Sequence, residues 1–253
     1  MSASPAETQV TDVDTKPPYT LCVLAIAAAC AAFTAFVYVY PRLAGPTIAR
    51  MDRALGLEQF ENGQRLQAAG EYANAIQSYQ LALEGHFEDP KYRTFTLKAL
   101  GALLWWREGA EAALPYLEEA YQSPHAPLTL FDPLCDSLLQ TGRIEDIPPV
   151  CERWYHEAGL ENDAEQQARA LYYLGKVQQE RGDEDGAMAR FYQGVLLHPG
   201  GDNAYELGLA YYNAGDNNQA LVYLEQYLES GSGGRAQYAR EVRDRILAKR
   251  SVE

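Results

Sequence analysis

The chain has 253 residues, of which 47% are hydrophobic, and it contains four cysteines. Its net charge at pH 7 is −14, which excludes binding to nucleic acid or to an anionic membrane surface by bulk electrostatic attraction. The cysteines form no CxxC pair, so a zinc knuckle and a thioredoxin-type redox motif are also excluded.

Residues 1–18 are expected to form a disordered tail, and they precede an apolar run at 19–40 that has no charged residue. The 22 residues of this run, at about 1.5 Å each, match the hydrocarbon core of a bilayer, which is about 30 Å thick. Tyr19, Tyr38 and Tyr40 stand at its ends, where aromatic rings favour the membrane interface. We predict one uncleaved transmembrane helix; a cleaved signal peptide is the alternative, and the acidic residues before the run disfavour it.

The charges beside this run bear on its orientation. Arg42, Arg50 and Arg53 follow it, in a segment at 41–55 that is expected to be a juxtamembrane linker, whereas Lys16 and the α-amine precede it. Because positive charges favour the cytoplasmic side, the expected topology is a single-pass membrane protein with a slight preference for a cytoplasmic C-terminal domain. The side of the membrane remains open at this point.

Between residues 56 and 230 the chain repeats one pattern about five times. Each copy has a small residue in a first column, a glycine seven or eight residues later, and a second apolar residue sixteen residues after the first column. The first-column residues are Gly63, Gly101, Cys135, Gly175 and Gly208, so successive copies are 38, 34, 40 and 33 residues apart. The residues sixteen positions later are Tyr79, Leu117, Cys151, Phe191 and Leu224.

This pattern predicts an all-α fold of helix–turn–helix units. Apolar residues recur three and four positions apart on both sides of each turn glycine, as in two amphipathic helices. No unit of this size can bury its apolar stripe alone, so the copies must stack on one another. The copy at 128–158 is degenerate, since Pro133, Pro148 and Pro149 interrupt it, and we expect it to be bent or loose.

The stretch at 180–186, ERGDEDG, suggests either an RGD adhesion motif or a calcium loop. A calcium loop that starts at Asp183 requires glycine and glutamate where this chain has Met188 and Gly194. Gly182 instead occupies the turn-glycine column, and the acidic residues after it stand where a second helix begins and carboxylates stabilise free N–H groups. We therefore interpret the stretch as an interhelical turn.

On these columns the segment at 56–229 resembles the tetratricopeptide repeat family. The resemblance implies a right-handed α-solenoid whose first helices line a concave groove that binds a peptide or helix of a partner protein. The groove residues that it implies are Phe60, Gln64, Lys98, Trp105, Arg169, Tyr172, Lys176, Tyr205 and Tyr212, with Asp132 and Asp136 from the degenerate copy. Of the adjacent Trp105 and Trp106, we expect Trp105 to be the exposed one.

Residues 235–250, which follow the sequence GSGG, are predicted to form a basic amphipathic helix that caps the stack. Residues 235–253 contain six basic and three acidic residues, in contrast to the acidic remainder of the chain. Terminal units of stacked repeats require such a solvated outer face.

The function that this sequence favours is a membrane-anchored scaffold or adaptor, and the alternative is a self-assembling structural component of a membrane or envelope complex. No catalytic residue, cofactor site or metal site is expected, since the four histidines form no pair at ligand spacing and no phosphate-binding loop or nucleophile motif occurs. The expected partner is therefore a protein, with homo-oligomerisation left open. Whether Cys135 and Cys151 form a disulfide also remains open, because this depends on the compartment.

Overall fold

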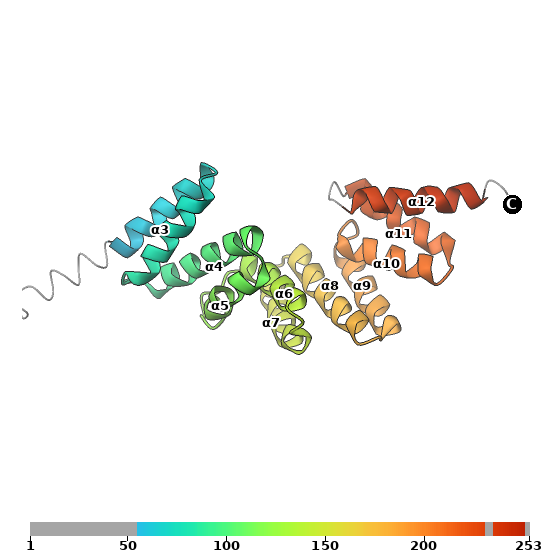
Figure 1. Cartoon of the computed structure of the whole chain (residues 1–253). Helices are drawn as coiled ribbons and strands as arrows, with labels where there is room; N and C mark the ends of the chain where they lie inside the picture. The colour runs from blue at the N-terminus through green and yellow to red at the C-terminus, as the bar shows by residue number, and fades with distance from the viewer. Residues whose placement is uncertain (1–54, 231–234, 251–253) are drawn as a thin grey trace, which may run out of the picture. The chain divides into compact units, whose positions relative to one another are not determined.

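The computed structural model describes residues 55–230 and 235–250 (Figure 1). Within these ranges every regular element is a helix, as the periodicity predicted. In chain order the helices are residues 55–68, α3 (Tyr72–Glu84), α4 (Pro90–Arg107), α5 (Ala110–Tyr121), α6 (Phe131–Gln140), α7 (Ile147–Leu160), α8 (Ala164–Glu180), α9 (Glu184–Leu197), α10 (Asp202–Asn213), α11 (Asn217–Ser230) and α12 (Ala236–Arg250). The short 3₁₀ turns η2 (Leu128–Leu130) and η3 (Ile144–Asp146) precede α6 and α7.

These helices pair in sequence as antiparallel hairpins. The helix at 55–68 pairs with α3, α4 with α5, α6 with α7, α8 with α9 and α10 with α11, and α12 packs on α11 (Figure 1). Each hairpin also packs against the next one, so that the second helix of one copy contacts the first helix of the following copy. In the following, "first helix" means the earlier helix of each hairpin.

The first column of the repeat marks the place where the two helices of a hairpin approach most closely. A Cβ atom on Gly175 would lie 2.3 Å from Cε1 of Phe191, and one on Gly101 would lie 2.7 Å from Cδ2 of Leu117. Such distances are sterically forbidden, so glycine is required opposite a large side chain. The sixteen-residue spacing in the sequence is therefore a packing contact in the fold.

The turn glycines have the left-handed conformation that their column predicted. Gly182 has φ = 76°, and no heavy atom lies within 4 Å of the position that a Cβ would occupy, so conformation rather than space selects glycine there. The Asp183 carboxylate accepts a hydrogen bond of 2.9 Å from the backbone N–H of Gly186 and so caps α9. The ERGDEDG stretch is thus an interhelical turn.

The degenerate copy was expected to be bent or loose, and its core is nevertheless buried, although α6 and α7 approach each other over less of their length than the helices of the hairpins α4–α5, α8–α9 and α10–α11. Phe131 and Trp154 are both 0% exposed, and their rings stack at a centroid distance of 5.7 Å with an interplanar angle of 12°. Pro148 and Pro149 stand in the first turn of α7, where a missing N–H costs nothing. The prolines at the start of α7 are therefore compatible with a full-length helix and a closed core.

The helix α12 covers the end of the stack with one apolar face. Ala236, Ala239, Val242 and Ile246 are buried, while the basic residues at 240, 243, 245 and 249 are at least partly exposed. This arrangement is that of a capping helix with a solvated outer face.

None of the helices within 55–230 and 235–250 is both long and apolar enough to cross a membrane. The predicted tail, transmembrane helix and linker at 1–18, 19–40 and 41–54 lie outside the described residues.

Candidate functional site

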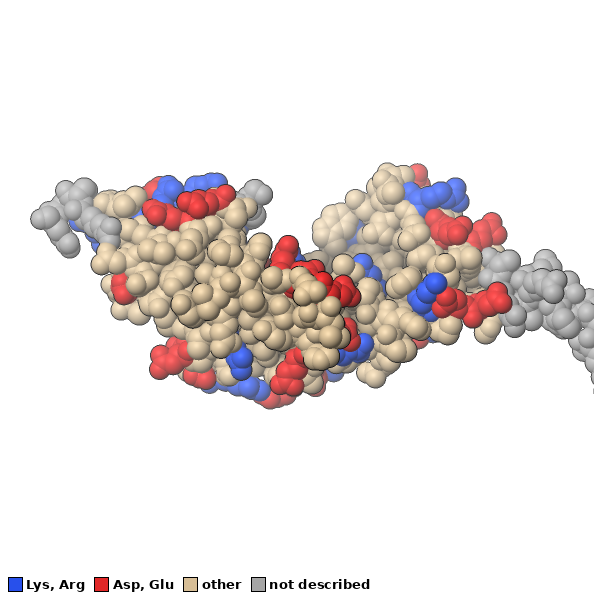
Figure 2. Space-filling view, turned by 180° about the vertical axis from the view of Figure 1, so that it is seen from behind, with Lys and Arg blue, Asp and Glu red and all other residues tan. Residues whose placement is uncertain are grey.

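A cavity of about 340 Å³ opens on the first-helix side of the stack. The first helices α4, α6 and α8 line it together with the loop at 198–201, the start of α10, Tyr227 of α11 and Arg235 just before α12. Its charged lining residues are Asp132, Asp136, Glu165, Arg169, Asp202 and Arg235. We call this feature the central cavity. Figure 2 shows one face of the molecule, on which acidic side chains gather beside a hollow in the surface.

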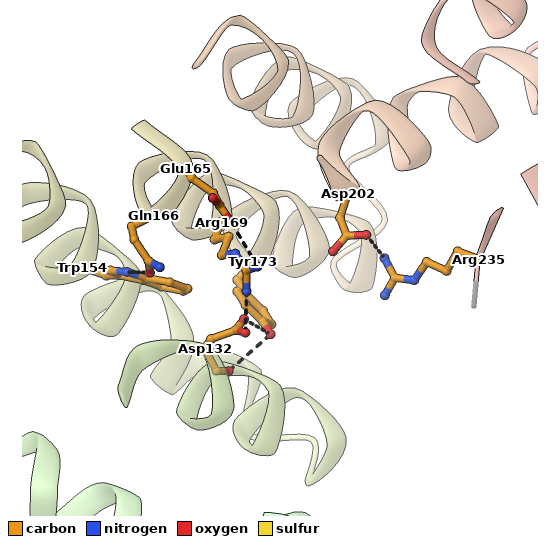
Figure 3. Close-up of polar contacts among 8 residues, drawn as sticks. All are labelled: Asp132, Trp154, Glu165, Gln166, Arg169, Tyr173, Asp202 and Arg235. Carbon is orange, nitrogen blue, oxygen red and sulfur yellow. Dashed lines mark hydrogen bonds and ion pairs between the residues drawn. The ribbon is translucent and has the colours of Figure 1, made fainter. Parts of the chain in front are cut away.

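On one side of the central cavity, α6 and α8 are joined by a polar network (Figure 3). Arg169 contacts Asp132 through Nη1 and Oδ2 at 2.8 Å and Glu165 through Nη2 and Oε1 at 3.2 Å. The Tyr173 hydroxyl donates a hydrogen bond of 3.0 Å to Oδ1 of Asp132. Burial, and then the nearby Asp132 carboxylate, raise the pKa of Tyr173, which keeps the hydroxyl protonated as a donor. Both oxygens of Asp132 are therefore engaged within the fold.

Asp136, one turn further along α6, keeps an oxygen available. The indole Nε1 of Trp105 donates a hydrogen bond of 2.7 Å to Oδ2 of Asp136, and Gln140 donates to the same oxygen. Within the described residues, Oδ1 of Asp136 accepts no hydrogen bond. Because a carboxylate can accept several bonds, this oxygen can receive a donor from a bound molecule.

On the other side of the central cavity, Arg235 fills a site between aromatic and acidic side chains. Its Nη2 donates a hydrogen bond of 3.0 Å to the Tyr172 hydroxyl, and its Nη1 lies 3.3 Å from Asp202 Oδ1 (Figure 3) and 3.5 Å from Glu206 Oε1. The guanidinium carbon lies 5.5 Å from the ring centroids of both Tyr172 and Tyr205. Burial raises the pKa of Tyr172 to about 12, so this hydroxyl also stays protonated.

The central cavity brings together several of the residues that the sequence placed in a groove. Those residues are Trp105, Asp132, Asp136, Arg169 and Tyr172, from three consecutive first helices. Two of them, Asp132 and Tyr172, share one column, since each stands three residues before the first column of its copy. Gln64, Lys98, Lys176 and Tyr212 lie on first helices but not in the lining of this cavity.

Three predicted groove residues are buried: Tyr172, which is 9% exposed at the cavity, and two that lie outside its lining. Phe60 is 5% exposed and packs against Tyr79 and Tyr92 at ring-centroid distances of 6.1 and 6.0 Å, so it belongs to the core and not to an open groove. Tyr205 is 9% exposed and packs against Tyr227 beneath the Arg235 guanidinium. The physical reason is that aromatic side chains bury a large area wherever a neighbouring element can cover them.

The expectation for the two adjacent tryptophans was also wrong. Trp106 is 60% exposed and meets Tyr72 edge to ring at 4.9 Å, whereas Trp105 is half-buried at the cavity. The hydrogen bond from Trp105 to Asp136 explains this, because a tryptophan N–H that leaves water requires an acceptor.

Sequence reasoning missed the part of the lining that comes from outside the first helices. Arg235, Tyr227 and the loop at 198–201 have no position in the first-helix columns, so the pattern gave no signal for them. Asp202 could have been found, since it stands six residues before Gly208, as Arg169 stands six residues before Gly175.

The lining of the central cavity is predominantly acidic. Four carboxylates, from Asp132, Asp136, Glu165 and Asp202, face the two guanidinium groups of Arg169 and Arg235. Throughout the described part of the chain, no three histidine, cysteine, aspartate or glutamate side chains gather in an arrangement that could hold a metal ion. The lining residues can form ion pairs and ring contacts, and such interactions suit recognition of another molecule.

Comparison with known proteins identifies repeats in the sequence. The family model described as tetratricopeptide repeat matches residues 169–199 and 202–230, which are the α8–α9 and α10–α11 hairpins. No curated protein matches the sequence significantly.

Solved structures show the same fold. The MamA protein is 22% identical with a TM-score of 0.55, over 73% of this chain and 95% of that one. YrrB, described as a tetratricopeptide repeat protein with an unusual peptide-binding site, is 22% identical with a TM-score of 0.51, over 72% and 90%. PilF of Pseudomonas aeruginosa is 16% identical with a TM-score of 0.56, over 78% and 91%. The described chain is thus an all-helical solenoid that contains tetratricopeptide repeats.

Proposed function

We propose that this protein is a membrane-anchored scaffold that docks a segment of a partner protein on the first-helix side of its solenoid. The observation that carries the proposal is the central cavity, which three consecutive first helices line with charged and aromatic side chains. Stacked repeats form extended surfaces of this kind, on which successive units contact successive parts of one ligand.

The composition of the lining supports a protein partner. Tyrosine, tryptophan and arginine are the side chains that contribute most to protein–protein binding, and Trp105, Arg169 and Tyr172 stand together here. The peptide-binding site named for YrrB supports the same class of ligand on the same fold.

The anchoring part of the proposal rests on the uncharged run at 19–40. The arginines that follow it favour a cytoplasmic solenoid. Protease digestion of sealed membrane vesicles of known orientation tests both points. A solenoid on the cytoplasmic side of the membrane is cut only in vesicles whose cytoplasmic face points outward. Release of the full chain from membranes by high salt or carbonate would contradict the anchor.

Photo-crosslinking in membranes tests the docking site. A photo-reactive residue at position 105 or 169 is expected to give an adduct with a discrete second protein, identified by mass spectrometry. The matched control is position 192 on the second helix α9, where Tyr192 is 47% exposed and is not part of the cavity lining.

The pattern of adducts decides between the functions. Loss of the adduct from position 105 when Asp136 is replaced by arginine, with an unchanged helical circular dichroism spectrum, would support docking in the cavity. Adducts only with a second copy of this chain would favour self-assembly instead. Equal adducts from positions 105 and 192 would overturn the site.

A further inference from the structure

We propose that the partner segment is basic and that it places an arginine side chain in the central cavity, between the carboxylates of α6 and that of Asp202 at the start of α10. This inference rests on the proposed function and specifies the chemistry of the partner at the same site. Three observations support it: the charge of the cavity, an unpaired acceptor oxygen, and the contacts that hold the chain's own Arg235.

The charge of the cavity selects a cation. Its two guanidinium groups are already paired inside the fold, Arg169 with Asp132 and Glu165, and Arg235 with Asp202. Asp136 has no cationic partner among the described residues, and four carboxylates line the cavity against two cations. An acidic segment would meet like charges in a partly enclosed space, whereas a basic one would neutralise them.

One acceptor oxygen at the cavity has no donor among the described residues. It is Oδ1 of Asp136, whose other carboxylate oxygen accepts hydrogen bonds from Trp105 and Gln140. A ligand rich in N–H donors satisfies such an acceptor, and a carboxylate ligand does not.

Arg235 shows what kind of group this surface holds. Its guanidinium lies against the rings of Tyr172 and Tyr205, bonds to a tyrosine hydroxyl and pairs with Asp202 and Glu206. Glu206 is 8% exposed, and both of its ion-pair distances, to Lys176 and to Arg235, are 3.5 Å. A planar fork of five donors matches carboxylates better than an ammonium group, so arginine is preferred to lysine.

The first test is selection from a display library of short random peptides, with the full-length chain in nanodiscs as the target. Arginine-containing peptides are expected to be enriched, with lysine second and acidic peptides depleted. A selected peptide should lose about tenfold in affinity when its arginine is replaced by citrulline, which keeps the shape but removes the charge. Its binding should also weaken as salt concentration rises.

Variants of the chain locate the site. Asp136→Asn keeps an acceptor for Trp105 and removes the charge, and it is expected to weaken the selected peptide about tenfold. Glu152→Gln, on the exposed side of α7, is the matched control and should leave binding unchanged. Arg235→Gln should strengthen binding, because it releases Asp202 for the peptide, and misfolding cannot imitate a gain in affinity.

The possible results separate this inference from the function on which it rests. Enrichment of acidic or purely apolar peptides would overturn the basic partner and leave the docking function intact. Absence of any enriched peptide would overturn both. Equal weakening by Asp136→Asn and Glu152→Gln, or weaker binding by Arg235→Gln, would overturn the location. The full chain could also form dimers that the selected peptide dissociates. This result would show that the basic helix α12 of a second copy binds in the cavity, and it would overturn the proposal of a separate partner protein.

Discussion

In the α8–α9 hairpin, Gly175 on the first helix faces Phe191 on the second, whereas in the α6–α7 hairpin the same two positions are Cys135 and Cys151. The cysteine sulfurs lie 3.6 Å apart, and both residues are fully buried. The pair of a glycine and a large ring in α8–α9 is thus replaced in α6–α7 by two side chains of intermediate size. The comparison teaches that the repeat constrains the combined volume of the pair and not the residue in either position.

The two hairpins also differ in what they offer the central cavity. The α6–α7 hairpin contributes two carboxylates, Asp132 and Asp136, from its first helix, while α8 contributes a mixture of acidic, basic and aromatic side chains. The poorest copy of the sequence pattern therefore supplies the most acidic part of the site. Its central side chains, Phe131 and Trp154, are nevertheless as fully buried as Phe191 in its neighbour.

The largest difference between the hairpins should appear when the second member of the pair is truncated. Phe191→Ala removes a fully buried ring that no other side chain can replace, and we expect a loss of about 3–5 kcal/mol in the free energy of unfolding. Cys151→Ala removes a single sulfur and should cost about 1 kcal/mol. Urea unfolding followed by circular dichroism measures both, and equal losses would contradict the volume argument.

Filling the first position of the regular hairpin should have a smaller effect. Gly175→Cys places a Cβ 2.3 Å from the Phe191 ring and should destabilise the chain by about 1–3 kcal/mol. The double variant Gly175→Cys with Phe191→Cys copies the pair in α6–α7. It should be more stable than the sum of the two single losses predicts, because the changes compensate each other in volume. Strict additivity in the same urea titrations would show that the pairs are not interchangeable.

The turn glycines should respond alike in both hairpins. Gly142 and Gly182 have φ values of 72° and 76°, with no atom within 4 Å of a Cβ at either position. Replacement of either by alanine should therefore cost only the left-handed strain, about 1–2 kcal/mol. Thermal unfolding of the two variants side by side checks this, and a cost that is much greater at Gly142 would mean that the α6–α7 turn carries strain of its own.

The smallest effect concerns the reactivity of the cysteine pair at neutral pH. Burial, followed by the contact with Cys151, raises the pKa of Cys135 well above its ordinary range, so the reactive thiolate is scarce in the folded protein. Iodoacetamide should modify Cys135 slowly in the native chain and rapidly in urea, as measured by mass spectrometry of the Cys135 peptide. The native rate should rise only as the pH exceeds the usual thiol range. Rapid native labelling at neutral pH would show that this hairpin opens.

The sequence was a good guide to the fold for a local reason. Amphipathic periodicity, turn glycines and the sixteen-residue spacing all act between residues close in the chain, and the hairpins follow them. It was a partial guide to the site, since columns say which face of a first helix a residue occupies but not what covers it. Phe60 and Tyr172 share a column with Asp132, yet neighbouring rings bury both of them while Asp132 is partly exposed.

The class of fold and the register of the hairpins follow from the sequence alone. Only the tertiary structure decided that Trp106 rather than Trp105 is exposed, and that Asp136 keeps an unpaired oxygen. Only it placed Arg235 beside Tyr172, from a position 63 residues away in the chain. The physical reason is that helix periodicity is a property of one segment, whereas exposure and charge pairing depend on which other segments arrive at the same place.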